Sequence, residues 1–351
     1  MPKRVERLYI TLTNECNMAC PHCWVAASPN PAALDELRVS EHIAVIDALL
    51  DNGLKTVKVT GGEPFVRKEA LHSILRHCNQ RGLEVNIETN GTLIDANDIS
   101  LMKSLRECEV SVSLDYPDSR HDTFRRTPHA FEVVTRNIRL LNEAGLAPVV
   151  ITAVHRDNLP SMRSIADYVL NTLGCTLIKF VCCIDIGRAA RDMDNQLLSP
   201  KEVVAFYEEL GRIAVAHPQH VTAMVPYAFH RIGGALRIGV CEPSTILGLL
   251  PNGDVAICGI GITNKKAVLG NVRMSDIRDI VDHSAVLRSL RVRQKYTGIC
   301  GTCIFRDVCA NVCPAHAFAH SGSYSGAYPV CQVIYEAGLF PSEFLIGESV
   351  S

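Results

Sequence analysis

Short apolar runs alternate with longer amphipathic segments along the first two thirds of the chain. Six runs rich in β-branched residues are typical of buried strands, and helix-length segments with apolar residues at three- and four-residue spacing separate them. Because strands that alternate with helices pair in parallel through right-handed crossovers, the pattern predicts an α/β fold, a partial (β/α)6 barrel of the TIM type. The expected strands are 7–12, 55–60, 83–88, 109–114, 148–154 and 176–181.

Two of the amphipathic segments also carry sequence signals for helix ends. The segment from residue 40 begins with Ser40, a residue type that caps helix N-termini, and Gly53 is expected to end it. A second segment stops at Gly145 in the same way. Both segments are therefore expected to be helices between strands.

The helical pattern weakens after about residue 235, where glycines and cysteines become frequent. We expect a barrel domain at residues 1–217, a linker region at 218–240 and a second domain at 241–351. The second domain is small and poor in long helices, so bound metal is expected to supply stability that its core cannot.

The charge of the chain argues against a nucleic-acid or anionic-membrane partner. Its 351 residues carry a formal net charge of −2, and no stretch has the apolar length of a membrane span or a signal peptide. We therefore expect a cytoplasmic protein that binds neither nucleic acid nor membrane. In that reducing compartment its 15 cysteines indicate metal, clusters or catalysis rather than disulfides.

Three of the cysteines lie within eight residues, directly after the first expected strand. Cys16, Cys20 and Cys23 have the spacing C-x3-C-x2-C. A structural zinc site or an ordinary iron–sulfur cluster takes four protein ligands, so three ligands leave one position open for a substrate. Ligands of parallel α/β folds bind at the carboxyl ends of strands, and the next strands also end in polar segments there, at 59–64, 88–92 and 113–118.

The three-cysteine spacing, followed by Gly-Gly-Glu-Pro at 61–64, resembles the radical S-adenosylmethionine (radical SAM) superfamily. The resemblance implies a [4Fe–4S] cluster on Cys16, Cys20 and Cys23, whose fourth iron position is taken by the amino and carboxyl groups of S-adenosyl-L-methionine (SAM). Reduction of the sulfonium then yields methionine and a 5′-deoxyadenosyl radical, which abstracts a hydrogen atom from substrate. The chain is thus expected to be an enzyme of the oxidoreductase type.

The same resemblance suggests roles for other residues. Gly61, Gly62 and Glu63 resemble the element that binds the methionyl amino group, and His22 takes the place of the aromatic residue before the third cysteine. Arg125 resembles an arginine that pairs with the methionyl carboxylate, for which a forked guanidinium is suited. The other cofactor-binding candidates lie near later strand ends: Thr89, Asn90, Ser113, Asp115, Gly187 and Arg188.

Seven further cysteines beyond residue 240 form a second pattern. Residues 300–313 read C-x2-C-x5-C-x3-C, with two cysteines before them and one after. This pattern resembles the SPASM domain, a C-terminal iron–sulfur extension of some radical SAM enzymes. The resemblance implies two auxiliary [4Fe–4S] clusters with interleaved ligands, hence three clusters in all. The two ligand sets would be Cys241, Cys258 and Cys313 for one cluster and Cys300, Cys303, Cys309 and Cys331 for the other.

Several points stay open at the level of sequence. The first auxiliary set is one thiolate short, and its fourth position could be open for substrate, filled by water or Asp254, or reached by Cys182 or Cys183. Zinc is an alternative for the C-terminal cysteines, because soft thiolates suit both metals. The first three cysteines could likewise be a partial zinc site or buried thiols, and Arg125 or Arg188 a surface charge.

The auxiliary clusters that the resemblance implies favour a net oxidation or bond formation. Because SPASM enzymes often act on peptides, the resemblance further implies a peptide maturase that crosslinks or oxidises a ribosomally made peptide. The alternatives are dehydrogenation or epimerisation of a carbohydrate or small metabolite, tetrapyrrole side-chain modification, and a non-catalytic electron carrier. The first strand starts by about residue 7, so a separate leader-binding protein is an expected partner, beside a peptide or small-molecule substrate and a reductant such as flavodoxin or ferredoxin. Cys182 and Cys183 are the candidates for a catalytic hydrogen donor, unless they only pack as small apolar side chains.

Overall fold

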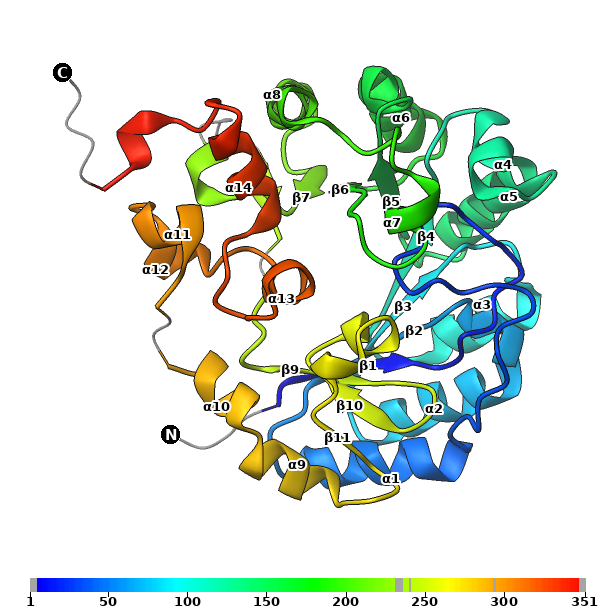
Figure 1. The fold of residues 1–351 in the computed structure, drawn as a ribbon. Coiled ribbons are helices and arrows are strands. Elements are labelled where there is room, and N and C mark those ends of the chain that lie inside the picture. Colours follow the sequence, from blue (N-terminus) through cyan, green and yellow to red (C-terminus); the bar gives the residue numbers. More distant parts are fainter. Residues whose placement is uncertain (1–4, 231–235, 240, 293–294, 347–351) are drawn as a thin grey trace.

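The computed structural model describes residues 5–230, 236–239, 241–292 and 295–346. Within this part of the chain, eleven strands form one continuous sheet in the order β11-β10-β9-β1-β2-β3-β4-β5-β6-β7-β8. Figure 1 shows these strands as an open arc, not a closed ring. The fold is therefore a partial α/β barrel, as the alternation of strands and helices predicts.

All six expected strands are present, and each is parallel to its neighbour. Because they are parallel, their carboxyl ends lie at one edge of the sheet, where the candidate residues were expected to gather. The strands are β1 (Arg7–Thr11), β2 (Thr56–Thr60), β3 (Glu84–Thr89), β4 (Cys108–Ser113), β5 (Val149–Val154) and β6 (Leu177–Cys182).

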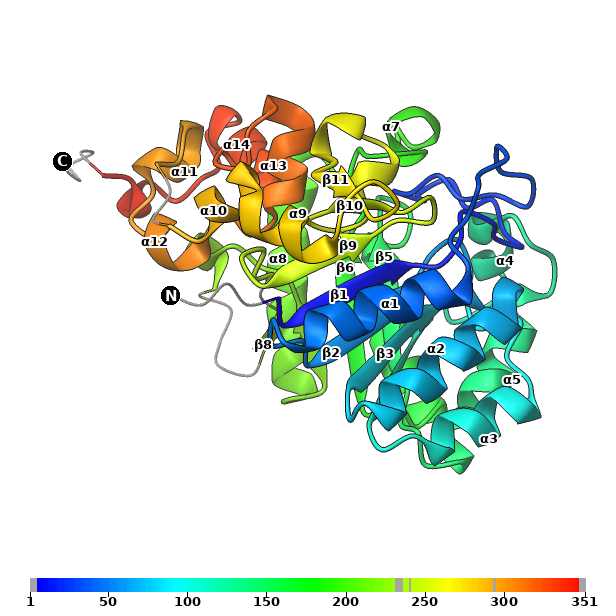
Figure 2. The same ribbon diagram turned by 90° about the horizontal axis from the view of Figure 1, so that it is seen from below.

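The longer connecting helices cover the outside of the arc (Figures 1 and 2). In one of them, residues 130–143, the buried side chains of Val134, Ile138 and Leu141 recur at three- and four-residue spacing and form the face toward the sheet. The outer helices are α1 (Val39–Leu50), α2 (Lys68–Gln80), α3 (Ala96–Ser104), α5 (Ala130–Glu143), α6 (Met162–Asp167) and α8 (Pro200–Ala216). Two short helices follow strand ends, α4 (Arg120–Arg125) after β4 and α7 (Ala189–Asp192) after β6.

The start of α1 differs from the expectation. The N-cap residue is Arg38 and not Ser40, because the Glu41 carboxylate accepts a hydrogen bond from the backbone N–H of Arg38 at 2.8 Å and so fixes the helix start two residues earlier. The end of α5 agrees with the expectation, since Gly145 follows it in the left-handed region with φ of +83°.

The C-terminal segment extends the barrel sheet and occupies the open side of the arc. β9 (Ile246–Leu249) pairs in parallel with β1, and β10 (Asp254–Ala256) and β11 (Gly270–Asn271) continue antiparallel. α14 packs against α8, and α11 to α14 lie beside the gap of the arc in Figure 1. The short helices of this segment are α9 (Ile277–His283), α10 (Ala285–Leu290), α11 (Gly298–Thr302), α12 (Arg306–Cys309), α13 (Pro314–Ser321) and α14 (Pro329–Glu336).

The region expected to be a linker carries regular structure. β7 (Val221–Ala223) pairs with β6, and β8 (Arg237–Ile238) pairs with β7, so both extend the barrel sheet. Residues 231–235 and 240 of that region lie outside the described residues.

One apolar core continues from the barrel into the C-terminal segment. Among the described helices, none combines the length and apolar character that crossing a lipid bilayer requires.

Candidate functional site

The three N-terminal cysteines lie on one compact loop after β1. Its two ends are held together, since the backbone N–H of Cys16 donates to the carbonyl of Ser28 at 3.0 Å. Cys16 and Cys20 are buried and Cys23 is half-buried, and all three are free thiols. The fold therefore brings the three expected cluster ligands together at the carboxyl edge of the sheet.

Burial raises the pKa of the Cys16 thiol to about 12, although a hydrogen bond from the backbone of Met18 opposes this. Burial also raises the pKa of Cys20, opposed by the positive charge of Arg125. Without a metal these thiols would stay protonated at neutral pH. A metal ion or cluster deprotonates its thiol ligands and so removes the cost of burying them, which makes the loop a fitting metal site.

The backbone of residues 61–63 lies directly against the start of the cysteine loop. The N–H groups of Gly62 and Glu63 donate to the carbonyls of Thr13 and Glu15 at 2.7 and 2.8 Å. A Cβ atom on Gly62 would lie 2.0 Å from the carbonyl oxygen of Glu15. Only glycine permits this approach, so the pair of glycines fixes the cysteine loop to the end of β2.

Glu63 is fully buried and links the ends of β2 and β3. Its carboxylate accepts hydrogen bonds from the Thr89 hydroxyl and the Asn90 N–H, both at 2.7 Å, and from the Phe65 N–H at 3.1 Å. Burial raises the pKa of Glu63 to about 7, although these hydrogen bonds favour the ionised form. The Asn90 amide in turn reaches the loop, donating to the Asn17 side chain at 2.8 Å, so Thr89 and Asn90 belong to the same network.

Asp115 and Arg125 form a buried ion pair beside the cysteine loop. Arg125 Nε donates to Asp115 Oδ2 at 2.7 Å, and Asp115 Oδ1 accepts from the backbone N–H of Ala153 at 2.9 Å. Burial alone would raise the pKa of Asp115, but the charge of Arg125 holds it well below its usual range. The Cys20 thiol donates to the Arg125 carbonyl at 3.8 Å, so this pair is adjacent to an expected cluster ligand. The terminal guanidinium nitrogens of Arg125 have no hydrogen-bond partner among the described residues, which leaves them for a carboxylate ligand. Ser113 lies two residues before Asp115, half-buried at the end of β4.

His22 belongs to a column of stacked rings. Its imidazole stacks on Phe124 with ring centroids 4.6 Å apart, and Phe124 stacks on His155 at 4.0 Å. Tyr116 closes the column, with its hydroxyl 3.1 Å from His155 Nε2. Burial and then the charge of Arg125 lower the pKa of His22 to about 3, so the ring is neutral at physiological pH.

Gly187 and Arg188 contact the backbone of the cysteine loop. A Cβ atom on Gly187 would lie 2.2 Å from the carbonyl oxygen of Trp24. The Arg188 guanidinium donates to the carbonyls of Cys20 at 2.7 Å, Ala26 at 3.0 Å and Ala27. Arg188 is therefore placed to hold the loop, and most of its donors are already used.

Cys182 and Cys183, at the end of β6, face different surroundings. Burial is the main cause that raises the pKa of the Cys183 thiol. The negative charge of Asp115 and then Cys182 raise this pKa further, and the positive charge of Arg125 opposes them. Cys182 instead lies among the core side chains and close to Tyr207 and Tyr328. The Cys183 N–H donates to the Val154 carbonyl at 2.9 Å and so continues the pairing of β6 with β5. Because successive side chains of a strand point to opposite faces, Cys183 and not Cys182 lies on the side of the buried ion pair.

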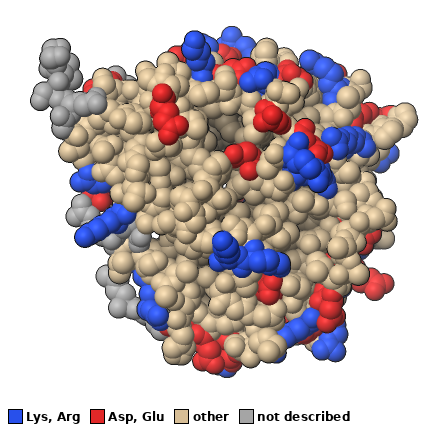
Figure 3. Space-filling model, viewed as in Figure 1, with Lys and Arg blue, Asp and Glu red and all other residues tan. Residues whose placement is uncertain are grey.

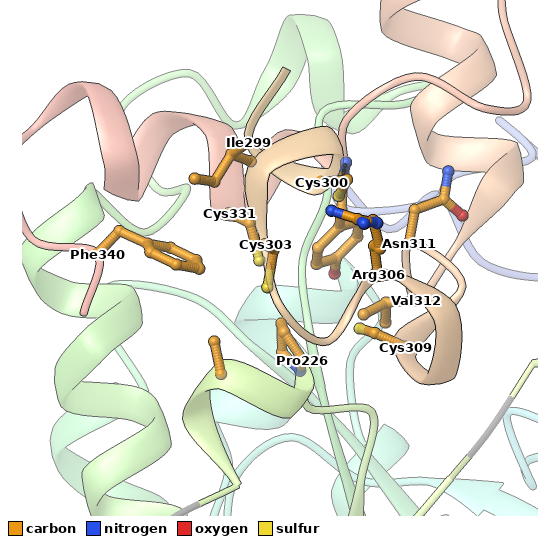
Figure 4. A pocket seen from close by; sticks show the side chains of 12 residues that line it. Pro226, Ile299, Cys300, Cys303, Arg306, Cys309, Asn311, Val312, Cys331 and Phe340 are labelled. Atoms are coloured by element: carbon orange, nitrogen blue, oxygen red, sulfur yellow. Dashed lines mark hydrogen bonds between the residues drawn. The ribbon is translucent and has the colours of Figure 1, made fainter. Parts of the chain in front are cut away.

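Four C-terminal cysteines surround one small cavity (Figure 4). Its volume is about 20 Å³, and its walls include Cys300, Cys303, Cys309 and Cys331. The backbone between Cys309 and Cys313, which belong to different expected clusters, is strained, since Ala310, Asn311 and Val312 all have positive φ, between 46° and 55°. That conformation costs roughly 1–2 kcal/mol per residue, which suits a loop whose shape a bound cluster dictates.

The remaining three cysteines also share one region. The pKa of Cys258 is raised by burial and then by the thiols of Cys313 and Cys241. The Asp254 carboxylate, considered as a fourth ligand, is already bound to Asn252, Asn271 and Lys265. The buried Tyr324 hydroxyl, whose pKa is raised by burial and then by Cys258, has no hydrogen-bond partner among the described residues, in contrast to Asp254.

A charged cluster lies inside the barrel and was not among the residues expected from the sequence. Lys58 forms an ion pair with Glu88, and Lys179 lies near both of them. Burial lowers the pKa of Lys179, opposed by the charge of Glu88. The sequence contains a pattern that predicts this cluster. Polar residues alternate with buried apolar ones along β2, β3 and β6, so their side chains must point into the barrel.

Comparison with known proteins agrees with this arrangement. The family model described as the radical SAM superfamily matches residues 10–169, and the model described as an iron–sulfur cluster-binding domain, SPASM, matches residues 241–304. The chain is 30% identical to an AdoMet-dependent heme synthase of Nitratidesulfovibrio vulgaris, over 91% of this chain and 90% of that protein. It is 27% identical to the antilisterial bacteriocin subtilosin biosynthesis protein AlbA of Bacillus subtilis, over 86% of this chain and 67% of that protein.

The fold also matches a solved structure. SuiB of Streptococcus suis bound to S-adenosylmethionine superposes with a TM-score of 0.75 at 14% identity, covering 94% of this chain and 78% of SuiB. At that identity the likeness concerns the fold alone. It includes both the barrel and the C-terminal segment, because nearly the whole chain is covered.

Proposed function

Because the chain belongs to the radical SAM superfamily and carries a C-terminal SPASM domain, we propose that it is an oxidoreductase that abstracts a hydrogen atom from a peptide substrate. As a member of this family it is an enzyme, and its cofactors are [4Fe–4S] clusters and SAM. The observation that carries the proposal is the cysteine loop, docked by Gly62 and Arg188 beside the Asp115–Arg125 pair.

Cys16, Cys20 and Cys23 would hold the SAM-binding cluster. When bound, that cluster supplies the electron that cleaves SAM to methionine and the 5′-deoxyadenosyl radical. The chain's own contribution is to position the reactants and to exclude water. Glu63, Thr89 and Asn90 fix the strand ends beneath the loop, and the buried Arg125 offers its two terminal nitrogens to the methionyl carboxylate.

The seven C-terminal cysteines would hold two auxiliary clusters, one on Cys241, Cys258 and Cys313 and the other on Cys300, Cys303, Cys309 and Cys331. Such clusters supply one-electron acceptors, which an oxidation started by a substrate radical requires. Tyr328 lies between the sets, since its backbone N–H donates to the Cys300 thiol at 3.3 Å and its ring is close to Cys313.

A peptide is supported by the charges around the cavity beside the cysteine loop. This cavity holds about 480 Å³ and is lined by Pro21, Phe124 and residues after β4, β5 and β6. Its two arginines are already paired, Arg120 with Asp118 and Arg126 with Asp192. Basic and acidic side chains are also interspersed on the face of the molecule seen in Figure 3. A cavity with balanced charge suits a peptide better than a ligand with several carboxylates. The similarity to AlbA, named for bacteriocin biosynthesis, supports the same class.

Side-chain modification of a tetrapyrrole is the second candidate. The supporting observation is the 30% identity to the heme synthase, with nearly equal coverage of both chains. A tetrapyrrole carries several carboxylates, so this candidate requires cations beyond the paired arginines. Lys179 inside the barrel has no ion-pair partner among the described residues and is available for that role, whereas Lys58 is already paired with Glu88.

The test begins with protein purified without oxygen and reconstituted with iron and sulfide. The parent should contain about twelve irons and the Cys16→Ala/Cys20→Ala/Cys23→Ala variant about eight, because each cluster holds four. With SAM and a reductant such as flavodoxin, only the parent should release 5′-deoxyadenosine. A parent that contains the clusters and releases none would refute the enzymatic proposal and leave the electron carrier.

The substrate class is tested with two probes. A library of ribosomally made peptides, with and without a candidate leader-binding protein, should increase 5′-deoxyadenosine formation above the level without substrate. Iron coproporphyrin III should have no effect. Stimulation by the porphyrin alone would reject the peptide and establish the second candidate.

A further inference from the structure

A cluster of two histidines and one aspartate connects the barrel to the C-terminal domain, outside every cysteine set. Asp185 follows β6, and His316 and His320 lie one turn apart on α13. The Nε2 atoms of His316 and His320 lie 3.1 and 2.9 Å from the same oxygen, Asp185 Oδ1. The three ligand atoms all lie within 4.8 Å of one another.

We propose that Asp185, His316 and His320 form a binding site for one divalent first-row transition-metal ion, distinct from the iron–sulfur clusters. Two imidazoles and a carboxylate are the donors that zinc and ferrous iron take in proteins. Ligand atoms of one such ion lie about 3–3.5 Å apart when each metal bond is near 2.1 Å. The separations from Asp185 are already close to that, so the metal requires only small side-chain movements.

The helix explains how the two histidines come together. Residues four apart on a helix lie on one face, so His316 and His320 point the same way, and their ring centroids are 5.0 Å apart. The backbone N–H of His316 donates to the carbonyl of Cys313 at 3.1 Å, which ties the start of α13 to an expected cluster ligand. Asp185 lies three residues before Arg188, which holds the cysteine loop.

Hydrogen bonding alone accounts poorly for this cluster. His316 is only 3% exposed, and its Nδ1 has no hydrogen-bond partner among the described residues. Both imidazoles use the same oxygen of a carboxylate whose side chain is 42% exposed. A buried polar atom without a partner costs about 1–3 kcal/mol. A metal–nitrogen bond at Nε2 does not give Nδ1 a partner, but it is stronger than a hydrogen bond shared with a half-exposed carboxylate and so contributes more to offset that cost.

The exposure of the cluster indicates what the ion can do. His320 and Asp185 have about two fifths of their side-chain surface accessible, so a bound ion keeps coordination positions open to solvent or to a ligand. The ion would bridge Asp185 of the barrel and α13 of the C-terminal domain. It therefore stabilises their packing and offers an attachment point for an oxygen or nitrogen donor of a substrate.

The experiment measures zinc binding and does not depend on turnover or on the proposed substrate. Protein with its iron–sulfur clusters fully loaded is dialysed without oxygen against micromolar Zn2+, and bound zinc is measured by mass spectrometry. The parent should bind one zinc per chain beyond its iron. His320→Gln should lose that zinc with unchanged iron, because the glutamine amide can still donate to Asp185 but is a poor ligand for zinc.

A matched control is the pair His217–Asp167, with a distance of 2.8 Å between His217 Nε2 and Asp167 Oδ1. In the part of the chain that the structure describes, no second histidine bonds to the Asp167 carboxylate. His217→Gln should keep the bound zinc. Asp185→Asn should lose it, which gives a second variant should one of them fold poorly. Equal zinc content in the parent and His320→Gln, or no zinc in the parent, would overturn the proposal.

Discussion

Arg188 and Cys20 are joined by a hydrogen bond across 168 positions of sequence, from the guanidinium Nη1 to the Cys20 carbonyl at 2.7 Å. The same guanidinium reaches the carbonyls of Ala26 and Ala27. The side chain that follows β6 therefore holds the loop that follows β1. This contact ties together two strand ends that lie five strands apart in the sheet.

Arg188→Lys should weaken the cysteine loop, because one ammonium cannot reach the three carbonyls that the guanidinium contacts. Each lost charged hydrogen bond costs roughly 1.5–3 kcal/mol. The purified variant should retain about four irons fewer than the parent, measured with iron and sulfide assays. Arg191→Lys, at an exposed neighbouring arginine, is the control and should keep the full iron content. Full iron content in Arg188→Lys would contradict the role of this side chain.

Arg125→Lys should weaken SAM binding about tenfold while the protein still folds, since lysine keeps the positive charge beside Asp115 but loses the forked contact to a carboxylate. Titration calorimetry on cluster-loaded protein measures the affinity. Arg120→Lys changes an exposed arginine of the same helix and should leave the affinity unchanged. An unaltered SAM affinity in Arg125→Lys would exclude Arg125 as a partner of the methionyl carboxylate.

Gly62→Ala should lower the free energy of unfolding by about 3 kcal/mol or more, because the new Cβ would meet backbone atoms that cannot move aside. Urea unfolding of the cluster-free chain measures this. Gly82→Ala, where nothing lies within 4 Å but φ is +70°, should cost only about 1–2 kcal/mol. Equal costs at the two positions would show that the close approach of Gly62 is not a constraint.

Cys183→Ala should reduce product formation strongly, whereas Cys182→Ala should leave it nearly unchanged, because only Cys183 faces the Asp115–Arg125 pair. The measurement is turnover on the substrate, compared with release of 5′-deoxyadenosine. If Cys183 donates a hydrogen atom, its variant should still cleave SAM but accumulate unfinished product. Normal turnover in the double variant would eliminate both cysteines as catalytic residues.

The pKa of about 7 for Glu63 gives a pH prediction of definite sign. A carboxyl whose folded pKa is raised stabilises the fold below its unfolded pKa, near 4.5, and that contribution is lost as pH rises through about 7. Glu63→Gln does not titrate, so its stability relative to the parent should improve between pH 5 and pH 8. The improvement should be of order 1–3 kcal/mol, measured by urea unfolding at each pH. A pH-independent difference would contradict the raised pKa.

The alternation of strands and helices could be predicted from the sequence. The spacing of apolar residues follows the geometry of the backbone, because a strand or a helix buries the side chains of one face. All six expected strands lie within one residue of their predicted bounds at either end. The cap at Ser40 was wrong, because the choice between neighbouring cap residues depended on the Glu41 side chain. The linker prediction overlooked β7 and β8, which are too short to show a period and form only because β6 offers a free edge.

The sequence by itself determined the partial barrel, the two cysteine patterns and the residues gathered at the strand ends, because spacing and periodicity are local properties. Only the tertiary structure decided which partners those residues have. It paired Arg125 with Asp115, directed Arg188 to the cysteine loop, separated Cys183 from Cys182 and brought Asp185 to two histidines more than 130 positions away. Such contacts depend on how the sheet curves and where the C-terminal domain fills its opening, and no local pattern encodes either.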